Sequence, residues 1–339
     1  MIPFRPLHLA FLLPALFSFG ACDATEVLDT PPEPAETGLV TFQVRFADFL
    51  DEDRPRIAVA PFDQPTNHRF IGGKEHALRS IFSPDQSNLL FAVLDSTTDF
   101  QKFLRYDVRL DTIYAMPGLR MGGFTPEQFA FKIESKSLTW NRAGTGFYFD
   151  DRFGVTNTLT TYYYGLGDST AAFLREQAAP VAYIGPDTLL VTARGPTTEW
   201  IVAYCLLNLK TGQLTPLNNP HLDPYNHPRT QTLDWNAEDR LFVASRLEPE
   251  GGALRSAHLI LTDLDGSFFQ VLTPLGPHRD IDPRWGPNGL VLFNRTPRDA
   301  RLEYLCGSIL LVEIETGVVR EWLRPEAVEG AVHLCQPDS

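Results

Sequence analysis

The 339-residue sequence lacks the short motifs that mark many catalytic sites. It contains no Gly-x-Ser-x-Gly, His-Glu-x-x-His, Cys-x-x-Cys or Walker sequence, so no nucleophile elbow, zinc-protease helix, dithiol motif or phosphate loop is indicated. The paired carboxylates of glycoside hydrolases leave no local motif, because the two residues can be distant in sequence. An enzyme that acts on carbohydrate therefore stays open as an alternative.

Positive charge is also scarce. The chain has 29 Lys and Arg against 42 Asp and Glu, a formal net charge of −13. Proteins that bind nucleic acid or anionic lipid headgroups by charge concentrate Lys and Arg. The composition therefore argues against nucleic acid as a partner, and the negative charge is most simply a solubility feature.

Long helical periodicity is missing after the first twenty residues, and a repeat takes its place. Each copy has a large apolar residue, a turn and then a compact apolar strand; the turns are rich in Pro, Asp, Asn or Gly. We call the large residues the landmark residues: Phe82, Trp140, Ile184, Trp235 and Trp285. Their spacings of 58, 44, 51 and 50 residues fit four short strands per copy, the size of a propeller blade.

A second turn follows the landmark in the later copies. Lys210-Thr211-Gly212, Asp265-Gly266 and Glu315-Thr316-Gly317 each lie between apolar runs, as in hairpins. Asp263-Leu264-Asp265-Gly266 lacks the further carboxylates and closing Glu of a calcium loop, so a hairpin turn is the better interpretation. One four-stranded sheet cannot bury both of its faces, so the copies must stack around an axis and close a ring.

The sequence thus predicts an all-β protein, a β-propeller of six four-stranded blades, with five or seven as alternatives. Val40–Phe46 alternates as a strand does, and residues 56–62 and 68–71 supply two more strands of a first blade. The missing strand is expected from the C-terminal segment around Ala331–Cys335. Strands from both ends of the chain would then close the ring and remove exposed edges. Residues 39–339 are predicted to form this single domain.

Two stretches resemble the Trp-Ser-Pro-Asp-Gly motif of TolB-like propellers, also called PD40 or WD40-like repeats. They are Phe82-Ser83-Pro84-Asp85 and Trp285-Gly286-Pro287-Asn288-Gly289. Leu261–Ser267 resembles the second hairpin of that family, and the resemblance covers roughly residues 75–325. It departs from the family at Ile184, which replaces the aromatic residue. The resemblance implies a propeller fold and an envelope role with protein partners.

The N-terminus has the order of an export signal. Arg5 is followed by an apolar stretch, and small residues precede Cys22. We interpret residues 1–21 as a lipoprotein signal peptide and Cys22 as the lipid-bearing residue; an ordinary cleaved signal and an uncleaved helix are the alternatives. Residues 22–38 are acidic and rich in Pro, which is typical of an unfolded tether. The predicted location is therefore a bacterial membrane, with the body in the periplasm or at the cell surface.

Three cysteines follow Cys22 in the chain. Disulfides persist in exported proteins, and Cys306 in the last copy would come near Cys335 if the ring closes. A Cys306–Cys335 bond is predicted on this basis, with two separate buried thiols as the alternative. Cys205 lies in an apolar run and is expected to be a small core residue.

Three histidines lie at similar places in their copies: His76, His227 and His278 come six to eight residues before a landmark. Loops at that place gather at one opening of a propeller. Converging imidazoles there could hold a divalent transition metal such as zinc, manganese or iron. Nearby arginines would add sites for an anionic ligand; they are Arg79, Arg229 and Arg279, with Arg284 close by. Unrelated loop histidines and local salt bridges are the alternatives, and a protein without cofactor is the simpler expectation.

Two functions follow. The favoured one is a non-enzymatic, membrane-anchored envelope lipoprotein that binds a protein, peptide or glycan, or that acts as a structural scaffold. The alternative is a metal-dependent carbohydrate lyase or hydrolase built on His76, His227 and His278. The absence of a recognisable nucleophile or paired-acid motif favours binding.

Overall fold

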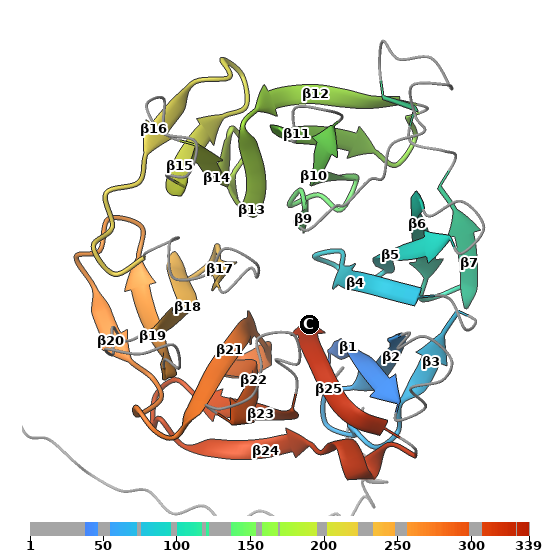
Figure 1. Cartoon of the computed structure of the whole chain (residues 1–339), viewed down its shortest axis with the longest axis vertical. Coiled ribbons are helices and arrows are strands. Elements are labelled where there is room, and N and C mark those ends of the chain that lie inside the picture. Colours follow the sequence, from blue (N-terminus) through green and yellow to red (C-terminus); the bar gives the residue numbers. More distant parts are fainter. Residues whose placement is uncertain are drawn as a thin grey trace, which may run out of the picture. The chain divides into compact units, whose positions relative to one another are not determined.

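The computed structural model describes residues 38–46, 55–72, 76–95, 100–116, 120–121, 137–153, 158–168, 170–194, 202–222, 233–247, 256–297, 307–329 and 331–338. Residues 37–339 form one compact unit. Its described part is all-β, with short antiparallel meanders arranged around a central opening (Figure 1). Among the described residues, no helix has the length and apolarity needed to cross a bilayer. The predicted signal peptide, Cys22 and nearly all of the predicted tether lie outside the described residues.

The strands follow the predicted order in each copy. The first meander after the N-terminal strands contains β4 (His76–Phe82), β5 (Asn88–Asp95), β6 (Phe100–Asp107) and β7 (Thr112–Ala115). The second contains β9 (Leu138–Trp140), β10 (Gly146–Phe153), β11 (Thr158–Gly165) and β12 (Thr170–Glu176). The third contains β13 (Ala178–Gly185), β14 (Thr188–Arg194), β15 (Val202–Asn208) and β16 (Leu214–Pro216). The short strand β8 (Arg120–Met121) pairs in parallel with the outer strand β12.

Two further meanders share one sheet. They are β17 (Leu233–Asn236), β18 (Leu241–Leu247), β19 (Ala257–Asp263) and β20 (Phe269–Val271), and β21 (His278–Trp285), β22 (Leu290–Pro297), β23 (Ser308–Glu313) and β24 (Val319–Leu323). A single parallel pairing of Ala257 with Arg279 joins them into the eight-stranded sheet. The propeller architecture is confirmed, and the count of six blades stays a prediction.

The chain ends meet in one sheet, as predicted. The order β25–β1–β2–β3 places β25 (Ala331–Asp338) innermost, beside β1 (Leu39–Phe46), β2 (Arg56–Pro61) and β3 (Arg69–Ile71) (Figure 1). β25 pairs antiparallel with β1 from Thr41 to Phe46, with two shifts of register. β25 extends three residues beyond the predicted end at Cys335, to Asp338. This extension brings a carboxylate to the centre of the ring.

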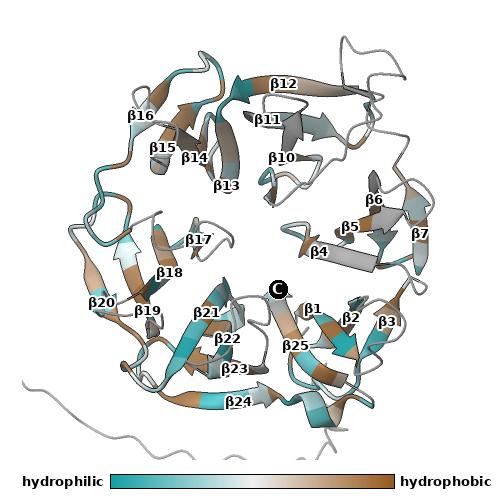
Figure 2. Cartoon of the chain, viewed as in Figure 1, coloured by the Kyte–Doolittle hydropathy of each residue, from teal (hydrophilic) through white to brown (hydrophobic). Residues whose placement is uncertain are grey.

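The core lies between neighbouring sheets, because each meander is apolar on both faces. One cluster joins Ile81 and Leu90 of β4–β5 to Trp140 and Phe147 of β9–β10. Burying one such large side chain contributes about 1.5–3 kcal/mol. Figure 2 shows that β18 is mostly hydrophobic, whereas the inner strand β21 is mostly hydrophilic. The polar groups of the candidate site come largely from such inner strands.

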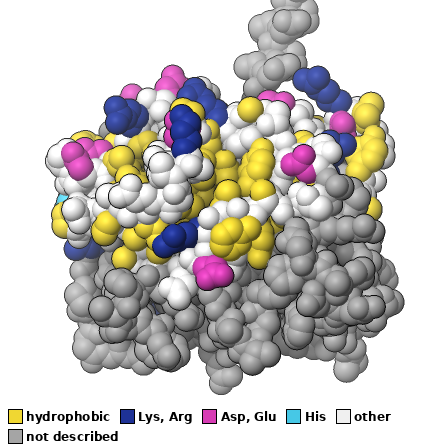
Figure 3. All heavy atoms as spheres, turned by 90° about the horizontal axis from the view of Figure 1, so that it is seen from above, with side chains coloured by type: hydrophobic (Ala, Val, Ile, Leu, Met, Phe, Trp, Pro, Cys, Tyr) yellow, Lys and Arg dark blue, Asp and Glu magenta, His cyan; other side chains and the backbone are white. Residues whose placement is uncertain are grey.

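The second turns are hairpin turns, as predicted. Gly212, Gly266 and Gly317 have φ values of 70°, 78° and 67°, which favour glycine over other residues. Asp263 accepts hydrogen bonds from the Ser267 hydroxyl and the Phe268 N–H, so its carboxylate stabilises the turn. Figure 3 shows acidic, basic and hydrophobic side chains interspersed among the described residues on one face.

Candidate functional site

The landmark turns line a central cavity of about 450 Å³. Side chains reach it from the inner strand of every sheet: β4, β9, β13, β17, β21 and β25. The lining includes the landmark residues themselves and the exposed turn residues Arg142 and Glu238. The sequence repeat that defines the fold therefore also supplies residues of the site.

The residues that directly precede the landmark residues in the sequence give the cavity a charged side and an uncharged side. Five residues occupy this position, and Asp338 of β25 lines the cavity beside them; in ring order they are Ile81, Thr139, Tyr183, Asp234, Arg284 and Asp338. The first three, from β4, β9 and β13, are uncharged and form what we call the neutral side. The last three, from β17, β21 and β25, form the charged side. The cavity thus offers apolar contact on one side and charge on the other.

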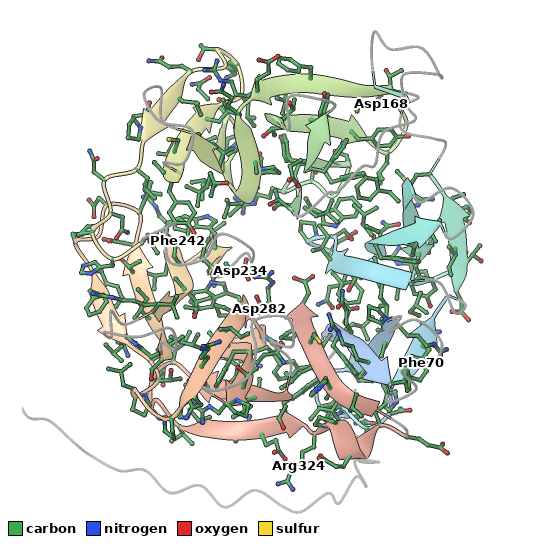
Figure 4. The ribbon with its side chains drawn as sticks, in the orientation of Figure 1. Phe70, Asp168, Asp234, Phe242, Asp282 and Arg324 are labelled. Carbon is green, nitrogen blue, oxygen red and sulfur yellow. The ribbon has the colours of Figure 1, made fainter. Side chains whose placement is uncertain are left out.

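Asp234 and Asp338 make the same contact with the next meander around the ring. Asp234 Oδ2 accepts the backbone N–H of Trp285 at 3.0 Å, and Asp338 Oδ2 accepts that of Phe82 at 2.8 Å. The N–H of Trp235 donates to Asp234 Oδ1 at 2.9 Å. Figure 4 shows Asp234 at the inner end of its sheet, facing the centre. These carboxylates therefore stabilise the ring and line the cavity at once.

Arg284 lies between these two carboxylates and is held on two edges. Its Nε lies 3.3 Å from Asp338 Oδ1, with side-chain exposures of 11% and 15%. Its Nη1 donates to the carbonyl oxygens of Pro283 at 2.9 Å and Leu233 at 3.4 Å. Within the described part of the chain, Nη2 has no acceptor. The guanidinium is therefore fixed while one nitrogen stays available.

A β-bulge gives Arg284 this direction. The pairing of β21 with β22 shifts register between Ile281 and Arg284, and Asp282 has a φ of 51°. Such a left-handed residue is strained unless it is Gly, and bulges re-aim the side chains that follow them. Figure 4 shows Asp282 near the centre of the ring.

Two of the landmark tryptophans join neighbouring meanders. Trp140 Nε1 donates to the carbonyl of Ile81 and Trp285 Nε1 to that of Asp234, each at 3.3 Å. Both acceptors precede the landmark of the previous copy. Trp235 Nε1 is buried without an acceptor. The equivalent acceptor would be on Tyr183, where β13 has an irregular register before Gly185.

The chemical groups of the cavity suit binding better than catalysis. The Ser83 hydroxyl donates to Asp85 Oδ1 at 2.6 Å and accepts the N–H of Asn88. The hydrogen bond from Ser83, and to a smaller extent one from Ser87, lowers the pKa of Asp85, so Asp85 is a weak base. Burial, and then Asp187, raise the pKa of Tyr183, so its hydroxyl stays neutral near pH 7. Ser83, which lines the cavity, and Asp85 beside it are thus engaged in the turn between β4 and β5.

His278 lies at the opposite end of β21 from Trp285, away from this cavity. Its Nε2 is 3.8 Å from Asp280 Oδ2 and makes no hydrogen bond. Arg295 forms two bonds with the buried Asp280, at 2.7 and 2.8 Å. Burial lowers the pKa of His278; Asp280 raises it and Arg295 lowers it. Arg279 is buried, and burial lowers its pKa.

The other predicted ligand residues cannot be placed. His227 and Arg229 lie outside the described residues, as do the side chains of His76 and Arg79 in β4. The part of the chain that is described holds no cluster of three metal-ligating residues. The metal site on His76, His227 and His278 stays a prediction.

Sequence reasoning named the landmark residues and Arg284 but missed the carboxylates of the cavity, Asp234 and Asp338. It assigned Arg284 to the loops near His278, but the residue lies at the landmark end of β21. The usable signal was the position just before each landmark, where a strand must direct a side chain to the side opposite the landmark. Asp338 carried no such signal, because no landmark follows it.

Both described cysteines fit their predictions in part. Cys205 is free and buried, as expected. Cys335 is disulfide-bonded, which shows that it is not a separate buried thiol. Its partner lies outside the described residues, so the pairing with Cys306 stays a prediction.

Solved structures share this architecture. TolB from Acinetobacter baumannii matches with a TM-score of 0.64 at 12% identity, over 89% of this chain and 66% of the TolB chain. The fold is that of TolB-type propellers. A protein assigned as TolB from Agrobacterium tumefaciens gives 0.58 at 12% identity, over 88% and 90% of the two chains. The propeller domain of the Trilobed protease from Pyrococcus furiosus gives 0.55 at 13%, over 84% and 94%.

These matches confirm the TolB-like propeller predicted from the repeat, and at this identity they concern the fold. The Pyrococcus furiosus domain is described as having an open velcro topology, whereas in this chain β25 pairs with β1. No protein-family model matches the chain, and no curated protein matches its sequence.

Proposed function

We propose that this protein is an exported, lipid-anchored envelope protein whose propeller binds a protein, peptide or glycan at the central cavity and catalyses no reaction. The observation that carries the proposal is the cavity of about 450 Å³, lined from six inner strands with a charged and a neutral side. Ligand sites are typically concave, mostly apolar and equipped with a few fixed polar groups.

Binding is favoured over catalysis because the polar groups are already engaged. Asp234 and Asp338 each accept a backbone N–H from the next meander. A catalytic acid or base needs a free proton position and a pKa suited to transfer. The fixed groups instead suit recognition, which gains from pre-organised side chains.

Export is supported by residues at both ends of the chain. Small residues before Cys22 resemble a lipoprotein processing site. The disulfide at Cys335 fits an oxidising compartment. Labelling of cells with a palmitate analogue tests the lipid: we expect a labelled wild-type protein and an unlabelled Cys22→Ser variant. Equal labelling of both would contradict anchoring at Cys22.

Site-specific photocrosslinking in cells tests the binding site. A photoreactive phenylalanine analogue replaces Ala237, an exposed cavity residue, or as a control Leu110, which is 64% exposed on a turn at the outer strands. We expect a discrete adduct from position 237, identified by mass spectrometry as a protein or glycan, and none from position 110. Adducts from both positions alike, or from neither, would refute binding at the cavity.

A further inference from the structure

We propose that Arg284 is the specificity-determining residue of the central cavity and that it binds a carboxylate of a peptide ligand. The carboxylate belongs to an acidic side chain or to a chain terminus. This inference rests on the proposed binding function and adds the chemical class of the ligand. It uses no catalytic step.

The first argument is the set of donors on Arg284. Two Nη1 contacts to main-chain carbonyls and the ion pair of Nε with Asp338 hold the guanidinium through two of its three nitrogens. The N–H groups of Nη2 have no acceptor among the described residues, although the side chain is only 11% exposed. A hydrogen bond from a charged nitrogen to a carboxylate is about twice as strong as one between neutral groups. A ligand carboxylate supplies the acceptor that the protein leaves out.

The second argument is pre-organisation. The bulge before Arg284 directs the side chain toward the cavity, and a left-handed Asp282 forms part of that bulge. Strain of this kind persists where the surrounding structure enforces it, which is common at binding sites. A guanidinium fixed before the ligand arrives loses little freedom on binding.

The acidic neighbours do not repel an anion as strongly as their number suggests. Asp338 is paired with Arg284 itself, and its other oxygen accepts the N–H of Phe82. Asp234 accepts two N–H groups, from Trp235 and Trp285. Donors aimed at a carboxylate offset part of its charge. Arg142, on the exposed turn of β9–β10, adds a second cation to the lining.

The neutral side favours a peptide over an acidic glycan. Aliphatic side chains line it, including Ile81, Val181 and Ile184. Sugar sites rely on exposed aromatic faces. On this side Trp140 is 5% exposed and packs on Phe147, and the half-buried Tyr183 stacks on Tyr148. A peptide can place an acidic residue against the fixed arginine and a neighbouring apolar residue against the aliphatic side chains opposite it.

The test is a selection of random eight-residue peptides by mRNA display against the purified full chain in detergent. One library has a free terminal carboxylate, and the other has a blocked terminus. We expect enriched peptides to carry Asp or Glu beside an aliphatic residue, or to depend on the free terminus, which separates the two sources. Synthetic versions in which Gln or an amide replaces the carboxylate should bind at least tenfold more weakly.

Protein variants complete the test. Arg284→Lys keeps the positive charge but cannot bond the main-chain carbonyls through one nitrogen and the ligand through another, and it should lose affinity about as much as the neutral peptide does on the wild type. Arg320→Gln on the outer strand β24 is the matched control and should bind as the wild type does. The peptide change leaves the protein intact, so that comparison does not depend on the folding of the variant, and urea unfolding checks that Arg284→Lys is folded.

Three outcomes would overturn the inference. Enriched peptides without carboxylates, or equal binding by Arg284→Lys, would remove Arg284 as the recognition residue. Binding of oligoalginate that depends on Arg284, without any enriched peptide, would make the ligand an acidic glycan. No enrichment together with an adduct from position 237 would refute this inference alone, whereas no enrichment and no adduct would refute the proposed function as well.

Discussion

Asp338 accepts the backbone N–H of Phe82 across 256 residues of sequence, with 2.8 Å between Oδ2 and N. The same carboxylate lies 3.3 Å from Nε of Arg284. One side chain therefore joins β25 to the inner strands on both of its flanks. Closure of the ring and the charged side of the cavity depend on the same residue.

Replacing Asp338 should destabilise the fold. Asp338→Ala leaves the Phe82 N–H without its acceptor and Arg284 without its ion pair. We expect a loss of about 1.5–3 kcal/mol in the free energy of unfolding, measured in urea. Asp338→Asn keeps an oxygen acceptor for Phe82 and should lose less.

The matched control for Asp338 is Asp187→Ala. Asp187 pairs with Lys210 at 2.7 Å, but the two side chains are 43% and 72% exposed. Exposed pairs contribute less than about 1 kcal/mol. A loss for Asp338→Ala no larger than that for Asp187→Ala would show that the contact does not stabilise closure.

The three landmark tryptophans should respond differently to replacement by Phe. Trp140 and Trp285 each lose a hydrogen bond to the previous meander, whereas Trp235 loses none among the described residues. We expect Trp140→Phe and Trp285→Phe to lower the free energy of unfolding by about 1 kcal/mol more than Trp235→Phe does. Thermal and urea unfolding of the three variants measure this order. Equal losses would mean that these indole rings contribute to stability through packing alone and not through their hydrogen bonds.

The repeat predicted the architecture because its signals are local. A turn of Pro, Asp or Gly before an apolar strand recurs, and the observed β1 at Leu39–Phe46 differs from the predicted strand by one residue. The third copy kept the fold without an aromatic residue, because Ile184 still packs in the core between sheets. Strand order then follows from ring closure.

The site was less predictable because it depends on register and on distant contacts. The bulge at Asp282 shifts the register of β21 against β22 between Ile281 and Arg284, and no residue type announces it. The pairing of Asp338 with Phe82 joins the two ends of the domain. His278 has a place in its copy similar to that of His76 and His227, yet its ring packs beside the Asp280–Arg295 pair.

Strand register at Gly307 supports the predicted partner of Cys335. Gly307 and Leu334 exchange two backbone hydrogen bonds, at 3.0 and 3.2 Å. The next pair in an antiparallel ladder is a closer, non-hydrogen-bonded pair, so an extension of this pairing by one residue would set Cys306 opposite Cys335. We expect Cys306→Ser and Cys335→Ser to cost the same, about 2–4 kcal/mol, and the double variant to cost no more.

Thiol counting provides a direct check of that disulfide. In a Cys22→Ser background, the unfolded oxidised chain should react with maleimide at Cys205 alone, and the reduced chain at three positions. Three reactive thiols before reduction would contradict the bond.

Acid should weaken the fold through His278. Burial lowers the pKa of this histidine below its usual 6.5, so the unfolded chain binds its proton more readily. The stability that the neutral ring contributes is present above pH 6.5 and is lost as the pH falls through the lower pKa of the folded state. We expect wild type to lose more stability than His278→Gln between pH 7.5 and 5.5. Parallel pH dependences would show that His278 does not couple to folding.

Metal analysis separates the binding protein from the metal-dependent enzyme. The guanidinium of Arg295 is bonded to Asp280, beside His278, and repels a cation at that end of β21. We therefore expect elemental mass spectrometry to find the same zinc, manganese and iron content in wild type and in the His76→Ala, His227→Ala, His278→Ala triple variant. One metal ion per chain that disappears in the variant would reverse the assignment. The enzyme would then need testing on acidic carbohydrates, and the central cavity would not be the reactive site.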